Sequence, residues 1–112
     1  MKTVYICSKY CGTTKKFYIK ANIFCRAACD AGCLPFAPRN IFFQFLDEED
    51  KDEREKCLEL SLELIKKADE IWVIGQDFTK LMEEEIAFAK TLDKKIRYFD
   101  CDMEEYDGRH IR

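Results

Sequence analysis

Three consecutive glutamates in the stretch DFTKLMEEEIAFAK, residues 77–90, are the first candidates for chemistry. At about 100° per residue, a helix through this stretch has one apolar arc. That arc holds Leu81, Met82, Ile86, Phe88 and Ala89. Glu85 falls near the middle of the arc, whereas Glu83 lies on the opposite side and Glu84 at the edge. With Thr79 as the N-cap, Glu85 is expected to point inward from the second turn of the helix.

An inward-pointing carboxylate is unfavourable unless it is paired, hydrogen-bonded or used in a reaction. The pattern leaves two interpretations open. In one, Glu85 is paired with a basic residue such as Lys9 or Arg39. In the other, Glu85 is catalytic, because a carboxylate at the edge of a sheet can attack or stabilise a sugar oxocarbenium centre.

Seven cysteines are the other residues with possible chemistry. Cys25, Cys29 and Cys33 are spaced by four, which stacks thiols on one helix face, whereas zinc and iron–sulfur sites usually contain closer pairs. Small buried side chains are therefore favoured over a metal site. We expect no metal and no cofactor.

The composition limits the classes of function. A chain of 112 residues suits one domain, spanning 1–112, with 47% hydrophobic and 37% charged residues. Its formal net charge of −3 argues against a nucleic-acid polymer as partner, although a small anionic ligand can still bind locally. No apolar run is long enough to span a bilayer, and the N-terminal apolar run is too short for a signal peptide, so a cytoplasmic protein is expected.

Strand and helix patterns alternate along the chain. Apolar strands are predicted at 3–7, 33–38, 70–75 and 95–100, and helices at 15–31, at 52–67 and after Thr79. This order predicts an α/β fold: a small Rossmann-like (flavodoxin-like) three-layer sandwich with a mainly parallel four-stranded sheet. Ligands of such sheets bind beyond the carboxyl ends of the strands, here at CSKY, APRN and GQDFT.

Two segments fit this alternation less directly. The aromatic patch 41–46 is expected to form a short helical turn, and its apolar character makes it a candidate interface between copies of the chain. The acidic run that follows indicates a solvated helix start rather than a metal site. The tail from Asp102 to Arg112 shows no periodicity and is assigned no element.

With these residues in view, the chain resembles the nucleoside 2-deoxyribosyltransferase superfamily, and more closely its short bacterial and phage branch. The resemblance covers roughly 2–99 and rests on the order and spacing of several segments. These are VYICSKY, APRNIFFQFLDEEDKDERE, LELIKKADEIWVIG and TKLMEEEIAFAKTLDKKIRYF.

The resemblance implies roles for particular residues. Superfamily members open the helix with Ser-x-Gly and carry the nucleophilic Glu six residues after the Ser; here Thr79 and Glu85 occupy those positions. Glu85 would attack the anomeric carbon of a deoxynucleoside or its 5′-phosphate, the base would leave, and the sugar would pass to water or a second base. The loop with Ser8, Lys9 and Tyr10 would contact sugar and base.

The 5′ end of the ligand would lie near the start of the same helix. Thr79 and nearby backbone N–H groups would hold it, with Met82 among the substrate-binding residues. Arg39 would add positive charge at the pocket rim. Related proteins often form homo-oligomers, so the partners expected are a nucleoside or nucleotide and further copies of the chain.

Three departures from the family pattern bear on activity. Leu81 replaces the Gly of Ser-x-Gly, which removes a close backbone approach to a phosphate. Ser61 stands where characterised transferases carry an Asp, and a serine is no general acid near neutral pH. The branch's SPY and APH segments are SKY and APR here, so Lys9 and Arg39 add charge that favours an anionic ligand or neutralises Glu85.

Two main hypotheses follow, with a third behind them. The first is a nucleoside or nucleotide N-glycosidase or 2-deoxyribosyltransferase acting through Glu85. The second is a non-catalytic protein of the same fold that binds a nucleotide or nucleotide-derived signal. The third is a structural or partner-binding protein that uses the aromatic patch.

Overall fold

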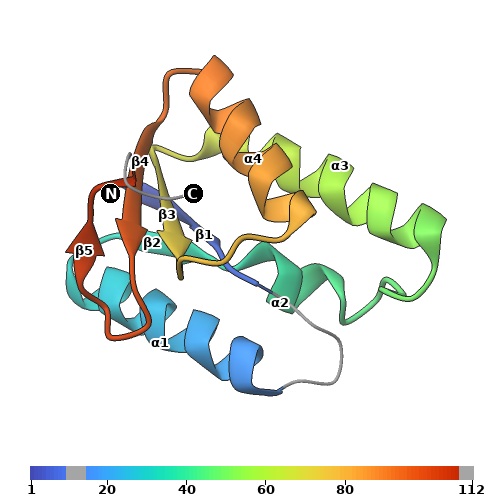
Figure 1. Ribbon diagram of the computed structural model, residues 1–112, viewed down its shortest axis with the longest axis horizontal. Coiled ribbons are helices and arrows are strands. Elements are labelled where there is room, and N and C mark those ends of the chain that lie inside the picture. The colour runs from blue at the N-terminus through green and yellow to red at the C-terminus, as the bar shows by residue number, and fades with distance from the viewer. Residues whose placement is uncertain (10–14, 109–112) are drawn as a thin grey trace.

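The computed structural model describes residues 1–9 and 15–108, with side chains in the first helix described from Ile19 onward (Figure 1). The strands are β1 (Thr3–Cys7), β2 (Leu34–Phe36), β3 (Glu70–Ile74), β4 (Lys95–Phe99) and β5 (Glu105–Tyr106). The helices are α1 (Lys15–Asp30), α2 (Pro38–Phe42), α3 (Lys51–Lys67) and α4 (Lys80–Thr91). The α/β class and the predicted alternation are confirmed.

The five strands form one sheet in the order β2-β1-β3-β4-β5. Strands β2, β1, β3 and β4 are parallel, as predicted, and β5 pairs antiparallel with β4. The expected count of four strands was therefore wrong by one. Strand β5 has two residues, too short to show a hydrophobic period, and lies in the tail that was assigned no element.

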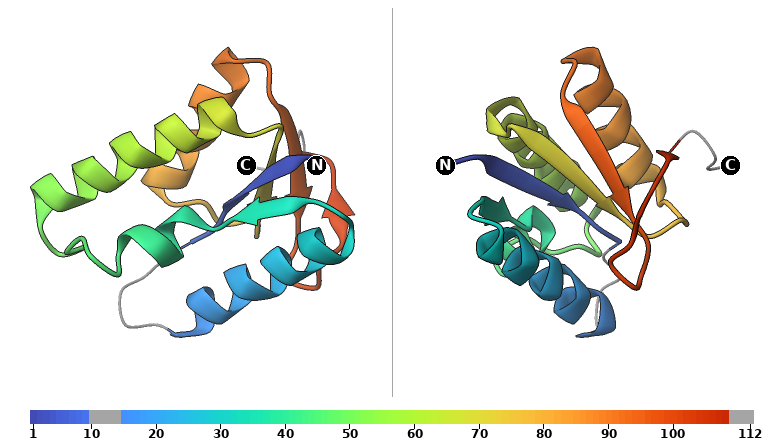
Figure 2. Two further views of the ribbon diagram at one scale, coloured as in Figure 1. Left: turned by 180° about the vertical axis from the view of Figure 1, so that it is seen from behind. Right: turned by 90° about the vertical axis from the view of Figure 1, so that its left-hand side faces the viewer.

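Helices cover both faces of the sheet, which gives the predicted three layers (Figures 1 and 2). On one face, α1 packs through Ala21, Phe24 and Ala28 against β1, β3 and β4. On the other face, α3 and α4 pack against the alternate residues of the same strands, including Tyr5 and Ile71. Because β1 and β3 are covered on both sides, every residue of β3 is buried.

Local sequence signals explain where the helices begin and end. The side chain of Thr79 accepts a hydrogen bond from the Met82 amide at 3.2 Å and so caps α4, as predicted. Asp50 caps α3 in the same way, so the acidic run is a helix start. Helix α1 ends before Gly32, whose φ of 82° suits the left-handed turn that follows many helices.

The amino-terminal ends of β1 and β3 are joined by reciprocal hydrogen bonds. The Thr3 amide and hydroxyl donate to the Asp69 carboxylate at 2.7 and 3.0 Å, and the Asp69 amide donates to the Thr3 carbonyl at 3.0 Å. Asp69 therefore anchors the start of β3 at the sheet edge opposite to the ligand edge of the fold.

The aromatic patch 41–46 forms the end of α2 and the turns after it. Pro38 stands at the first position of α2, where its missing N–H is tolerated. Ile41 and Phe45 are exposed to 48% and 60%, while the rings of Phe42 and Phe45 lie 6.1 Å apart. The expected helical turn is confirmed, whereas its role in assembly stays a prediction. No helix in the described part of the chain is long and apolar enough to cross a membrane.

Candidate ligand site

A cavity of about 220 Å³ opens at the carboxyl ends of β1 and β3. These neighbouring strands mark the point where the strand order reverses, since the chain leaves β1 for β2 on one side and returns to β3 on the other. Ligands of open parallel sheets bind at such switch points. The cavity is lined by Ser8, Lys9, Lys20, Ile74, Gly75, Gln76, Asp77 and Cys101.

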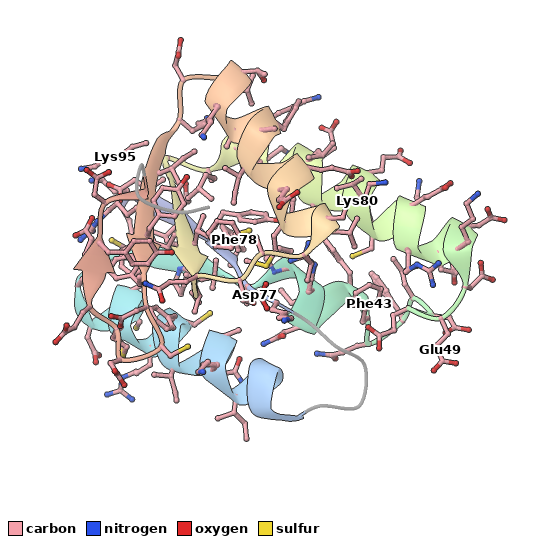
Figure 3. All side chains as sticks on the ribbon, viewed as in Figure 1. Phe43, Glu49, Asp77, Phe78, Lys80 and Lys95 are labelled. Carbon is pink, nitrogen blue, oxygen red and sulfur yellow. The ribbon has the colours of Figure 1, made fainter. Side chains whose placement is uncertain are left out.

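The charged groups of the cavity come from three elements. The Lys9 ammonium lies 3.0 Å from the Asp77 carboxylate, which links the segment after β1 to the loop after β3. Asp77 lies on the connection between β3 and α4 (Figure 3). Lys20 projects from the second turn of α1 and is half-buried. The cavity thus presents two ammonium groups and one carboxylate beside the polar side chains of Ser8 and Gln76.

The loop after β3 is fixed to the next two strands. Gly75 has a φ of 93°, a conformation that a glycine adopts without the steric cost of a Cβ. Its amide donates to the Phe99 carbonyl at 2.7 Å, and its carbonyl accepts a hydrogen bond from the Tyr106 hydroxyl. Strands β4 and β5 therefore hold one wall of the cavity in place.

Glu85 points inward from α4, as the helix geometry predicted, whereas Glu83 and Glu84 are exposed. Its side chain is 0% exposed. One carboxylate oxygen forms an ion pair with the Arg39 guanidinium, and the other accepts a hydrogen bond from the Tyr5 hydroxyl. Of the two interpretations, pairing with a basic residue is what the structure shows, and Glu85 is not among the described residues that line the cavity.

Arg39 joins this buried group to the cavity wall. Its other terminal nitrogen donates to the Ser8 carbonyl at 2.6 Å, and Ser8 lines the cavity. We expected Arg39 at an open pocket rim, but it is only 6% exposed. The difference has a physical reason, because the guanidinium neutralises an otherwise unpaired buried carboxylate.

Burial also sets the protonation states of Tyr5 and Cys7, two residues near Arg39. It raises the pKa of the Tyr5 phenol well above its usual value, although the Arg39 charge opposes this, so Tyr5 stays protonated and donates to Glu85. Burial likewise raises the pKa of the Cys7 thiol to about 11, again against the effect of Arg39. Cys7 is therefore a protonated core thiol near neutral pH.

The other predicted site residues are divided between cavity and core. Ser8 and Lys9 line the cavity. Thr79 and Met82 are not among the residues that line the cavity. Thr79 serves as a helix cap, and Met82 is a fully buried core residue. Tyr10 lies outside the described residues.

The sequence reasoning did not select several residues that the structure brings to the site. Tyr5 could have been found, because a tyrosine in a strand buried on both faces needs a hydrogen-bond partner for its hydroxyl. The loop Gly75–Asp77 had been recognised as a strand end, but its residues were not chosen. Lys20 and Cys101 carry no local signal, since their proximity depends on how α1 and the β4–β5 connection pack.

No group of three or more metal-ligating side chains occurs in residues 1–9 and 15–108. Cys25 and Cys33 are half-buried and pack against the core on the α1 face, whereas Cys29 is exposed. The prediction that these three cysteines are buried side chains therefore fits Cys25 and Cys33 in part. It was wrong for Cys29, which lies on the outer surface of α1.

Comparison with solved structures identifies the fold. A 2-deoxyribosyltransferase from Bacillus psychrosaccharolyticus superimposes with a TM-score of 0.71 at 20% sequence identity, covering 94% of this chain and 77% of the other. A 2-deoxyribosyltransferase from Leishmania mexicana gives a TM-score of 0.63 at 18% identity, covering 89% of this chain and 65% of the other. The fold is thus that of nucleoside 2-deoxyribosyltransferases, as the resemblance implied.

Among curated proteins, none matches the chain significantly. A family model, by contrast, matches almost its whole length. Residues 2–99 fit the model described as a domain of unknown function, DUF7768, and the chain belongs to that family.

Proposed function

We propose that the protein binds a nucleoside or nucleotide in the cavity at the ends of β1 and β3 and holds it without cleaving it. The fold shared with 2-deoxyribosyltransferases supports the ligand class. The polar and charged groups around an opening at the switch point support the place. The partners of Glu85 support binding without cleavage, and this last observation carries the proposal.

Both oxygens of the Glu85 carboxylate are engaged, one by Arg39 and one by Tyr5, and the side chain is fully buried. A nucleophile has to approach the anomeric carbon to roughly 3–3.5 Å. In this arrangement, Glu85 is linked to the cavity wall through Arg39, which donates to the Ser8 carbonyl. Ser61, where a general acid would be expected, is also buried and does not donate a proton near neutral pH.

Titration calorimetry with the four deoxynucleosides and their 5′-monophosphates tests the proposal. We expect at least one ligand to bind, and chromatography of the same mixtures to show no free base. Cys101 provides a second measurement, because its exposed thiol lines the cavity and its alkylation should slow when the ligand is bound. Cys29, an exposed thiol of α1 that does not line the cavity, is the internal control.

The second candidate is the enzyme hypothesis, an N-glycosidase or 2-deoxyribosyltransferase acting through Glu85. A specific observation favours it: a protonated tyrosine of β1 donates to the carboxylate that stands at the nucleophile position of the family. In this reaction, the Glu85 oxygen bonds to the anomeric carbon and the bond to the base breaks. Water or a second base then displaces Glu85 from the sugar.

Release of base from any deoxynucleoside or deoxynucleotide would establish the enzyme hypothesis over the binding hypothesis, provided that Glu85→Gln abolishes it. Release that continues in Glu85→Gln would rule out both hypotheses as stated. The exposed neighbour supplies the matched control, since Glu84→Gln makes the same change one residue away and should leave any activity intact.

A further inference from the structure

Lys20 adds a positively charged side chain to the cavity from helix α1. Its side chain lines the cavity from α1, which packs on the other sheet face from the buried Glu85. In the described part of the chain it forms no ion pair, whereas Lys9 of the same cavity is paired with Asp77. A half-buried ammonium without an acidic partner favours an anion from outside.

The resemblance implied that the 5′ end of a ligand would lie at the start of α4, beside Thr79, and not beside Lys20. The Thr79 oxygen already accepts the Met82 amide, and Leu81 replaces the glycine that would let a phosphate approach the backbone. Neither residue is among those lining the cavity. The positive charge of the cavity comes instead from Lys9 and Lys20.

The charges and size of the cavity indicate which anion fits. Two ammonium groups and one carboxylate leave a net charge of about +1, which a phosphate monoester with roughly −1.5 to −2 charges complements better than a neutral nucleoside does. A volume of about 220 Å³ is smaller than the roughly 300–1,000 Å³ typical of sites that enclose a whole drug-sized ligand. It suits the sugar phosphate, with the base extending out of the opening.

We propose that the ligand is a nucleoside 5′-monophosphate whose phosphate binds Lys20, with Lys9 as its second cation. The proposal rests on the proposed function and names its substrate class. Ser8 and Gln76 supply further hydrogen-bonding groups, and the Asp77 carboxylate holds the Lys9 ammonium beside the cavity. Lys20 is accordingly a specificity-determining residue.

The experiment compares affinities for a deoxynucleoside and for its 5′-monophosphate by titration calorimetry. The native chain should bind the monophosphate at least tenfold more tightly. Lys20→Gln should weaken monophosphate binding about 10- to 100-fold, the usual range for losing a hydrogen bond to a charged group, and leave nucleoside binding unchanged. Lys95→Gln is the matched control, since Lys95 is exposed at the amino-terminal end of β4, far from Asp77 (Figure 3).

The outcomes separate this inference from the proposed function. Absence of binding by every nucleoside and nucleotide contradicts both. Equal affinity of the native chain for nucleoside and monophosphate, or an equal loss of both in Lys20→Gln, overturns the phosphate assignment and leaves the proposed function standing. Deoxyribose 5-phosphate serves as a further ligand, and if it binds as tightly as the nucleotide, the nucleoside class is wrong. Thermal unfolding of each variant confirms that the chain is folded.

Discussion

Three buried side chains, Glu85, Arg39 and Tyr5, connect two helices and a strand through an ion pair and a hydrogen bond. Glu85 comes from α4, Arg39 from α2 and Tyr5 from the interior strand β1. An ion pair taken out of water contributes little net stability, because desolvation offsets the attraction, but removing one partner leaves an uncompensated buried charge. The group therefore fixes the relative placement of α2 and α4 more than it stabilises the chain.

Glu85→Gln should accordingly destabilise the protein by about 3–5 kcal/mol, because Arg39 would keep its buried charge without a partner. Chemical denaturation followed by circular dichroism measures this. Glu84→Gln, on the exposed side of the same helix, should change the free energy of unfolding by less than about 0.5 kcal/mol. The double variant Glu85→Gln/Arg39→Met should recover part of the lost stability, and a loss as large as in the single variant would contradict the ion-pair explanation.

Among the secondary-structure elements, the two-residue strand β5 supports the loop that follows β3. The Tyr106 hydroxyl donates to the Gly75 carbonyl, and the Tyr106 ring lies 5.8 Å from that of Tyr98. The antiparallel strand thereby supports the loop that carries Gln76 and Asp77 into the cavity. The wall of the candidate site thus depends on a segment some thirty residues later in the chain.

Tyr106→Phe should therefore weaken ligand binding by roughly fivefold to tenfold, since one hydrogen bond that orders the loop is lost while the ring packing remains. Calorimetry with the proposed ligand, a nucleoside 5′-monophosphate, measures the change. Thr91→Val removes a hydroxyl hydrogen bond at the end of α4, away from the cavity, and should leave affinity unaltered. An unchanged affinity in Tyr106→Phe would show that β5 does not support the site.

The helices and long strands were predictable because each has a strong period or a cap. Thr79 and the acidic run before α3 marked helix starts, and the apolar arc placed Glu85 correctly on the inward side. The sequence offered Lys9 and Arg39 as possible basic partners of Glu85 but could not decide between them or between pairing and catalysis, since Arg39 lies 46 residues away and on another element. Lys20 and Cys101 enter the site through packing alone, which no local period encodes.

At the scale of the whole molecule, acidic and basic groups gather at the sheet edge opposite to the cavity. The Thr3 amide and hydroxyl lower the pKa of the Asp69 carboxyl. Burial alone would raise the pKa of Glu70, but hydrogen bonds from Lys2 and Trp72 outweigh it, so that this pKa is lowered as well. Both groups link β3 to its neighbours in their charged forms.

These shifts predict a loss of stability in acid. A carboxyl whose pKa is lower in the folded chain stabilises it above the unfolded value, about 3.9 for Asp and 4.3 for Glu, and the contribution is lost as the pH falls through the folded value. The melting temperature should thus be level from pH 7 to about 5 and fall below that. Asp69→Asn should melt lower at pH 7 and decline less steeply, whereas Glu49→Gln, on an exposed turn, should follow the native curve (Figure 3).

The position of β1 inside the sheet, between β2 and β3, has a consequence for how the chain reaches its native state. Strand β1 is made before its partner β3, which begins at Glu70, and the Thr3–Asp69 link spans 66 positions. Closing so long a loop is slow, because the entropy is lost before the contacts form. Between the synthesis of β1 and that of β3, the segment Val4–Cys7 has an unpaired edge, so the nascent protein is most prone to aggregation in that interval.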